Sequence, residues 1–331
     1  MELFELTKAL VNIESITGHE QACGEFLAGF LRGQGFEVEM QPVSDNRANV
    51  FARLGKPDVM LSTHMDTVPP FIPASEDAEF VYGRGSCDAK GIIAAQITAA
   101  RRLKAAGVSG FGLLFLVGEE TLSDGARQAN ASPPGSKFMI NGEPTENKLA
   151  VGTKGILRVD IHATGRTAHS AYPQCGESAI DKLLDILNDV RRLPLPEDPV
   201  MGPSTMNIGV IEGGHAANVI PDSASAQILI RTVCNSKDLR AKFDEILKGR
   251  CRYEFVRETL PMRMESVDGF ETEVVAFCTD LPNLTRWGRP LLLGPGTIHV
   301  AHTDHEGVRK SDLTHAVELY SRLVKELKAR V

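Results

Sequence analysis

Three short, mainly apolar runs, each followed within two residues by a histidine or a glutamate, constrain the fold of this chain most strongly. The runs occupy residues 59–63, 111–117 and 138–141. Continuous apolar strands that alternate with helices indicate a mostly parallel sheet that is covered on both faces. The carboxyl ends of parallel strands meet at one edge of a sheet, and ligands bind at that edge. We therefore predict an α/β fold with a ligand site formed by the residues that follow these runs.

The pattern changes after residue 154, where apolar and polar residues begin to alternate. Residues 155–262 predict the order β-α-β-β-α-β, with strands at 157–163, 204–212, 223–233 and 253–260 and helices at 178–192 and 238–247. This order is the ferredoxin-like arrangement. Residues 263–331, with helices predicted at 272–279 and from Asp312, are too few to fold alone. We therefore expect one discontinuous domain, 1–154 plus 263–331, interrupted by an inserted α+β domain at 155–262.

Apolar periodicity in the N-terminal part predicts helices at 2–11, 20–34 and 89–106. Thr17 and Glu20 have the spacing of a capping box, in which the two side chains would close the start of the second helix. Strands are expected at 36–41 and 49–54.

Composition excludes several classes of protein. The net charge is −7, and no block of basic residues offers a nucleic-acid surface. The six cysteines are scattered without a C-x-x-C pair, which favours free thiols in a reducing compartment. The N-terminus lacks a signal-peptide pattern, and no apolar run is long enough to cross a bilayer. We expect a cytoplasmic protein without nucleic-acid or membrane partners.

Imidazoles and carboxylates follow the predicted strands and recur in the C-terminal segment. These residues are His64, Asp66, Asp88, Glu119, Glu120, Glu143 and His302. His64 and Asp66 are two positions apart, so an extended chain points both side chains to the same side. Carboxylates gathered at one sheet edge repel one another unless cations compensate them. The mixture of ligand types suits zinc, with manganese or cobalt as alternatives.

Other chemistries fit the sequence poorly. Asp88 stands where a dinucleotide-binding fingerprint requires Gly or Ala, and its charge would repel a pyrophosphate. The chain has no G-x-S-x-G elbow and no G-K-[ST] loop. Cys87 is a poor nucleophile because the neighbouring carboxylate of Asp88 raises the pKa of its thiol. Metal-dependent chemistry is therefore favoured.

Five ordered motifs resemble those of the M20 family of metallopeptidases and amidohydrolases. They occupy residues 62–69, 83–91, 119–120, 142–144 and 301–306. The resemblance extends from about residue 5 to the C-terminus. It implies a metal-binding catalytic domain interrupted by a smaller lid or dimerisation domain, and two Zn²⁺ ions, with Co²⁺ or Mn²⁺ as alternatives.

The resemblance also assigns roles to residues of the larger domain. One metal would be held by His64 and Glu143, the other by Glu120 and His302, with Asp88 bridging the two. Glu119 would be the general base. Asp66 would orient the ring of His64 through its second nitrogen.

Four further residues are candidate contacts to the substrate on the same resemblance. His169, in the segment 165–171, would stabilise the oxyanion, from its own chain or across a dimer interface. Asn218, in the segment 214–221, is a substrate-contact candidate. Arg231 would bind the substrate carboxylate, a task suited to a guanidinium. Gly296, in the Gly-rich turn 294–296, would line the pocket for that carboxylate.

The function implied first is hydrolysis of the amide bond of an N-acyl amino acid, as in acetylornithine or acetyl-lysine deacetylases. Glu143 rather than Asp at the third ligand position resembles the deacylase and carboxypeptidase branches of the family. The alternative is a carboxypeptidase or dipeptidase that acts on short peptides. A more remote alternative is a catalytically silent binding protein of the same fold. The expected assembly is a homodimer formed through the inserted domain.

Overall fold

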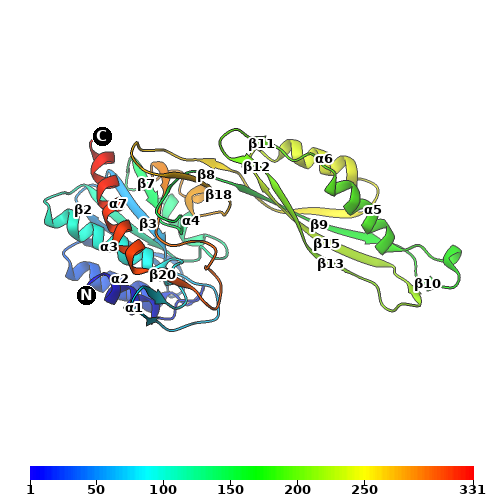
Figure 1. The fold of residues 1–331 in the computed structure, drawn as a ribbon, viewed down its shortest axis with the longest axis horizontal. Helices are drawn as coiled ribbons and strands as arrows, with labels where there is room; N and C mark the ends of the chain where they lie inside the picture. Colours follow the sequence, from blue (N-terminus) through cyan, green and yellow to red (C-terminus); the bar gives the residue numbers. More distant parts are fainter. The chain divides into compact units, whose positions relative to one another are not determined.

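The structure, a computed structural model, describes residues 1–331 and divides into two compact units (Figure 1). The first unit comprises Met1–Val151, Met264–Glu273 and Thr279–Val331, and the second comprises Gly152–Arg263 and Val274–Cys278. The expected boundaries differ from these units at three places. Gly152–Lys154, Arg263 and Val274–Cys278 were expected in the first domain but belong to the second unit.

A mixed sheet forms the centre of the first unit. Its strands, in spatial order, are β1 (Glu37–Ser44), β2 (Arg47–Leu54), β6 (Phe111–Leu116), β3 (Val59–His64), β7 (Phe138–Asn141), β19 (Arg289–Leu292) and β8 (Leu149–Thr153). The four strands from β6 to β19 are parallel, and every residue of β3 and β6 is buried. The flanking strands are antiparallel. The antiparallel pairing of β1 with β2 follows from their connection, because a two-residue turn can join only antiparallel strands.

Helices surround this sheet. They are α1 (Leu3–Val11), α2 (Gln21–Gly33), α3 (Lys90–Ala105), α4 (Asp124–Ala131) and α7 (Lys310–Lys328). The Ala-rich α3 packs against β3, α1 and α7, because its small side chains allow close approach. No helix of the protein combines the length and the apolar character that a membrane crossing requires. The six cysteines form no disulfide bond with one another.

The second unit has the predicted ferredoxin-like order. Its antiparallel sheet runs β13 (Thr205–Gly213), β15 (Ser223–Thr232), β9 (Gly155–Thr164) and β16 (Arg252–Thr259). Helices α5 (Ala179–Arg191) and α6 (Lys237–Leu247) contribute to the same apolar core as the inward residues of β9. Alternating burial along β9 produces this core, because successive side chains point to opposite faces of a sheet.

Short elements complete both units. In the first unit, β20 (Gly307–Arg309), β5 (Phe80–Tyr82) and β4 (Ser75–Glu76) form a small sheet, and Leu281–Asn283 form the 3₁₀ helix η2. In the second unit, β10 (Ala168–His169) pairs with β14 (Val219–Ile220), β11 (Glu197–Asp198) pairs with β12 (Gly202–Pro203), and Pro173–Cys175 form the 3₁₀ helix η1. Strand β17 (Met262–Arg263) pairs with β8.

Two local predictions are wrong. Residues 272–279 are not a helix, because Thr272–Val275 form strand β18, which pairs with β8. Three of these four residues are β-branched, and such residues favour extended chain. The capping box is also absent: α2 begins at Gln21 without a side-chain cap. Thr17 instead donates a hydrogen bond to Asp66, and Glu20 accepts hydrogen bonds from Arg47.

Candidate functional site

The ends of β3 and β7 and the start of α3 bring three candidate ligands together. His64 is the last residue of β3, Glu143 closely follows β7, and Asp88 precedes α3. All three side chains are buried, and their ligand atoms lie within 4.8 Å of one another. Nε2 of His64 lies 2.9 Å from Oδ1 of Asp88. Oε1 of Glu143 is buried without a hydrogen-bond partner. We call these three residues the first cluster.

Asp88 also belongs to a second cluster, with Glu120 and His302, whose ligand atoms likewise lie within 4.8 Å of one another. Nε2 of His302 lies 3.0 Å from Oε2 of Glu120 and 3.4 Å from Oδ2 of Asp88. One oxygen of Asp88 therefore faces His64 and the other faces His302. The backbone of His302 has φ 64°, a left-handed conformation that is uncommon outside glycine and tends to occur at functional sites.

Asp66 holds the turn that carries Glu119 and Glu120. Its carboxylate accepts the backbone N–H groups of Glu119 at 3.1 Å and of Glu120 at 3.2 Å. The hydroxyl of Thr17 donates to the same carboxylate at 2.8 Å. Nδ1 of His64 lies 3.0 Å from the backbone oxygen of Asp66 but 3.5 Å from its carboxylate. The ring of His64 is thus oriented mainly by the main chain of Asp66, while the carboxylate positions the Glu119–Glu120 turn.

Burial shifts the pKa values of the carboxyl groups in the clusters. It raises the pKa values of three side chains, Glu119, Glu120 and Glu143. Burial also disfavours the charged form of Asp88, but hydrogen bonds from His302 and His64 hold the pKa of Asp88 below its ordinary value. This group of carboxylates therefore needs compensating positive charge.

The same contacts shift the pKa values of the imidazoles. Hydrogen bonds to Asp88 and Glu120 raise the pKa of His302 to about 10. Burial disfavours the charged ring of His64, yet hydrogen bonds to Asp66 and Asp88 hold its pKa well above the ordinary value. A divalent cation can replace these protons, because metal ligation requires neutral imidazole and ionised carboxylate. The unpartnered oxygen of Glu143 and the donor set of both clusters fit two metal ions.

Within the second unit, His169 and Asn218 lie side by side. The pairing of β10 with β14 aligns His169 with Val219, and the backbone N–H of Ser170 donates to the backbone oxygen of Asn218 at 3.0 Å. Both side chains belong to exposed residues. Nδ1 of His169 accepts the N–H of Ala171 at 3.1 Å, so the proton of the neutral ring lies on Nε2, which can donate to a ligand.

Arg231 lies near the other end of β15 from this pair. The strand begins at Ser223, just after the segment that carries Asn218, and Arg231 is its penultimate residue. At the usual rise per residue, about 26 Å separate Ser223 from Arg231. In Figure 1, β10 lies at the end of the second unit that is remote from β11 and β12. The structure thus does not bring Arg231 together with His169 and Asn218 in one chain.

Gly296 contacts Cys87, the residue that precedes Asp88. Its φ is +81°, and a Cβ at this position would lie 2.5 Å from Sγ of Cys87. Gly296 also lines a cavity of about 390 Å³, together with Phe80 and Val300. Burial raises the pKa of Cys87 well above the ordinary value, and the charge of Asp88 adds to this effect. The environment of Cys87 thus opposes a nucleophilic role.

Three buried charged residues near the clusters were not predicted: Arg84, Asp280 and Glu306. Arg84 and Glu306 lie within the motifs 83–91 and 301–306, so their position in these motifs could have marked them as site residues. Asp280 precedes η2, and both its carboxylate oxygens are buried without a hydrogen-bond partner. Burial raises the pKa of Asp280 to about 7. No local pattern marks this residue.

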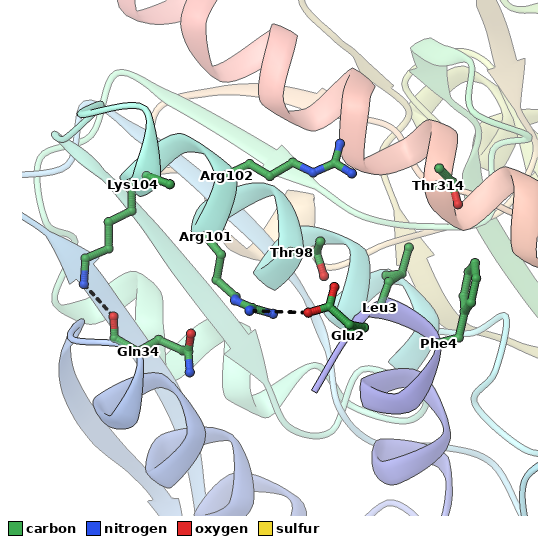
Figure 2. Close-up of a pocket in the computed structure, with 10 residues that line it drawn as sticks. Glu2, Leu3, Phe4, Gln34, Thr98, Arg101, Arg102, Lys104 and Thr314 are labelled. Carbon is green, nitrogen blue, oxygen red and sulfur yellow. Dashed lines mark hydrogen bonds and ion pairs between the residues drawn. The ribbon is translucent and has the colours of Figure 1, made fainter.

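The cavity drawn in Figure 2 contains none of the predicted site residues. It has a volume of about 720 Å³ and is lined by residues of α1 and α3. Arg101 lies 4.0 Å from Glu2, and Nζ of Lys104 donates to the backbone oxygen of Gln34 at 2.5 Å. Glu2 is the single acidic residue in the lining, and no histidine or cysteine lines the cavity, so it provides no acid–base constellation.

Comparison with known proteins defines the family. Residues 151–253 match the model of the peptidase dimerisation domain of M20 proteins. A peptidase M20 domain-containing protein of Schizosaccharomyces pombe is 40% identical over 335 residues, covering 97% of this chain and 84% of the relative. A probable carboxypeptidase of Aspergillus terreus is 39% identical over 363 residues, covering 95% of this chain and 84% of the relative.

Solved structures share the fold. A tripeptidase from Staphylococcus aureus aligns with a TM-score of 0.84 at 19% identity, covering 98% of each chain. A dinuclear metal-binding M20 peptidase from Bacillus subtilis aligns with a TM-score of 0.71 at 15% identity, covering 98% of each chain. The fold, the ligand clusters and the relatives define a metal-dependent peptide hydrolase. The chain belongs to the M20 family of metallopeptidases.

Proposed function

We propose that this protein is a dinuclear metallopeptidase that hydrolyses short peptides, with carboxypeptidase activity as the leading form. The structural observation that carries the proposal is the carboxylate of Asp88, whose two oxygens face two different ligand clusters. The substrate class follows the relatives, one of which is named a probable carboxypeptidase. This class replaces our first expectation, an N-acyl amino acid deacylase, which none of the reported relatives supports.

The proposed ligands are the two clusters described above. His64 and Glu143 would hold one ion, Glu120 and His302 would hold the other, and Asp88, which belongs to both clusters, would contribute to each. Such ions would supply a Lewis acid for the scissile carbonyl and would lower the pKa of water toward about 7. We propose zinc, since imidazole and carboxylate donors suit it, with cobalt or manganese as alternatives.

Glu119 is the proposed general base. It belongs to neither ligand cluster, although it neighbours Glu120. Its main chain is held by the carboxylate of Asp66. Burial raises the pKa of Glu119 well above its ordinary value, which makes its carboxylate a stronger base. The carboxylate of Glu119 accepts a proton from the attacking water and passes it to the leaving amine.

We further infer that a second copy of the chain completes the substrate site. Asn218 precedes β15 and pairs with the segment of His169, whereas Arg231 lies about 26 Å along β15 from its first residue, Ser223. An extended dipeptide spans only about 7 Å. A ligand of that size cannot contact both groups within one chain. A homodimer formed through the second unit supplies His169 as the oxyanion donor from the partner, while Arg231 and Gly296 bind the substrate carboxylate.

A substrate panel tests the proposal. Purified protein reconstituted with zinc is assayed against dipeptides, tripeptides, the same peptides with amidated C-termini, and N-acetylornithine. We expect release of the C-terminal residue from free peptides and a loss of at least tenfold in kcat/KM for the amidated forms. The Glu119→Gln variant, purified identically, controls for contaminating peptidases.

Two outcomes contradict the proposal. Faster turnover of N-acetylornithine than of every peptide would favour a deacylase. Stoichiometric metal binding without hydrolysis of any substrate would favour a silent binding protein. The dimer is tested separately by mixing a His169→Ala variant with a Glu119→Gln variant, because mixed dimers regain one intact site only if His169 acts across the interface.

A further inference from the structure

A buried ion pair links two segments that carry candidate ligands. Nη1 of Arg84 lies 2.7 Å from Oε2 of Glu306, and both residues are only 2% exposed. Arg84 stands four residues before Asp88, and Glu306 stands four residues after His302. The pair therefore connects the two segments that meet in the second cluster.

Glu306 fixes the main chain at Asp88. Its Oε1 accepts three backbone N–H groups, from Gly85 at 2.9 Å, Cys87 at 3.1 Å and Asp88 at 3.0 Å. Successive amides that converge on one anion form a concave anion-binding site, and hydrogen bonds to an ionised acceptor are the stronger kind. The backbone of Asp88 is thus held by charge as well as by packing.

Arg84 fixes the turn at His302. Its Nη1 also donates to the backbone oxygen of Thr303 at 3.1 Å, and its Nε donates to that of Pro70 at 3.3 Å. Thr303 directly follows His302, whose left-handed backbone needs external support. The backbone N–H of Gly83 donates to the backbone oxygen of Glu306 at 3.1 Å, which adds a main-chain link between the segments.

The hydrogen bonds of this pair reach the main chain at Asp88 and the turn after His302. They do not reach β3 or β7, which position His64 and Glu143. We infer that the Arg84–Glu306 pair is a positioning device that sets the spacing of Asp88 and His302, and thereby the affinity for the second metal ion. This inference rests on the two-metal centre proposed above.

The charge of Glu306 is essential to this arrangement. All four hydrogen-bond partners of the Glu306 carboxylate are donors: three backbone amides and the guanidinium of Arg84. In Glu306→Gln, the amide NH₂ must face a donor, because it cannot accept a hydrogen bond. One contact is therefore lost with almost no change in volume.

The experiment is a metal titration of the full chain after chelation. Wild type, Glu306→Gln and the matched control Glu318→Gln are titrated with Zn²⁺ by calorimetry and with Co²⁺ by absorption spectroscopy. Glu318 is suited to the control because its side chain is 64% exposed. For Glu306→Gln we expect the second ion to bind about 10- to 100-fold more weakly, the usual range for loss of a group that orients a ligand. Because Asp88 also belongs to the first cluster, the first ion should weaken as well, but clearly less than the second, and the control should match wild type for both ions.

Arg84→Lys provides a milder second variant, because it keeps the charge but replaces the planar fork by a single ammonium. It should weaken the second ion by an intermediate factor and shift the Co²⁺ spectrum of that ion more than the spectrum of the first. If both variants fold and bind two ions with wild-type affinities, the pair has only a structural role. Equal weakening of both ions also overturns the inference. A wild-type chain that binds fewer than two ions overturns the proposed centre itself, so the two failures are distinguishable.

Discussion

Replacement of Gly118 by alanine should impair the site more than it impairs the fold. Gly118 has φ +75° and precedes Glu119, and a Cβ there would lie 2.0 Å from Oδ1 of Asp124 and 2.7 Å from Nη2 of Arg47. Gly107 offers a matched control, because its φ is +76° and a Cβ there meets no atom within 4 Å. Gly107→Ala therefore measures the left-handed backbone alone, which costs about 1 kcal/mol.

The magnitude for Gly118→Ala follows from these distances. A carbon–oxygen approach of 2.0 Å must open by at least about 1 Å before it is tolerated, and overpacking of this kind adds about 1–3 kcal/mol. Asp124 resists movement because Nη1 of Arg47 binds its carboxylate at 2.6 Å, and Arg47 is itself held by two 2.9 Å contacts to Glu20. The turn that carries Glu119 is then the part that shifts. A displacement of about 1 Å at a reacting group costs about 100-fold in rate.

Urea unfolding and steady-state kinetics measure the two effects separately. Trp287 is the single tryptophan, and it is buried in the first unit beside Phe51, with Nε1 donating to the backbone oxygen of Ala129 at 3.0 Å. Its fluorescence therefore reports on unfolding of the unit that contains the site. If Gly118→Ala matched Gly107→Ala in both unfolding free energy and kcat/KM, the steric argument would be refuted.

Two further predictions concern buried carboxyl groups. Glu119→Gln should lower kcat/KM by about 10²- to 10⁴-fold while the metal content by mass spectrometry stays at the wild-type value; near-normal turnover would exclude Glu119 as the base. Burial raises the pKa of Asp280 to about 7, so between about pH 4 and 7 the unfolded chain releases a proton that the folded chain retains, and stability falls as pH rises. Asp280→Asn should therefore flatten the dependence of the urea midpoint on pH in chelated protein, as followed by Trp287 fluorescence, whereas an unchanged slope would contradict this assignment.

The sequence predicts the centre of the first unit well because buried strands have a recognisable local pattern of apolar residues. Fully buried strands such as β3 and β6 appear as continuous apolar runs, and their parallel pairing places the residues after them at one edge. The same logic explains why His64 and Glu143, from β3 and β7, meet in one cluster. Their grouping follows from topology and needs no knowledge of individual contacts.

Contacts between distant segments escape such patterns. Thr17 and Glu20 have capping-box spacing, yet their side chains bind Asp66 and Arg47, which are far away in the sequence. The carboxylate of Asp66 holds a turn after β6, a role that the His64–Asp66 spacing does not reveal. The helix predicted at 272–279 is also wrong, because Thr272–Val275 pair with β8 as an extended chain. In each case the deciding partner is supplied by the tertiary fold.

The sequence of one chain also does not decide between a peptidase and a deacylase. The five motifs contain the proposed metal ligands and base, and amide hydrolysis of either substrate class needs the same groups. Discrimination must then come from the residues that contact the rest of the substrate. His169 and Asn218 lie near the start of β15 and Arg231 lies near its end, and about 26 Å of strand separates Ser223 from Arg231. If a partner chain brings these ends together, the specificity pocket is a property of the assembly. The sequence of one chain then specifies the reaction more directly than it specifies the substrate.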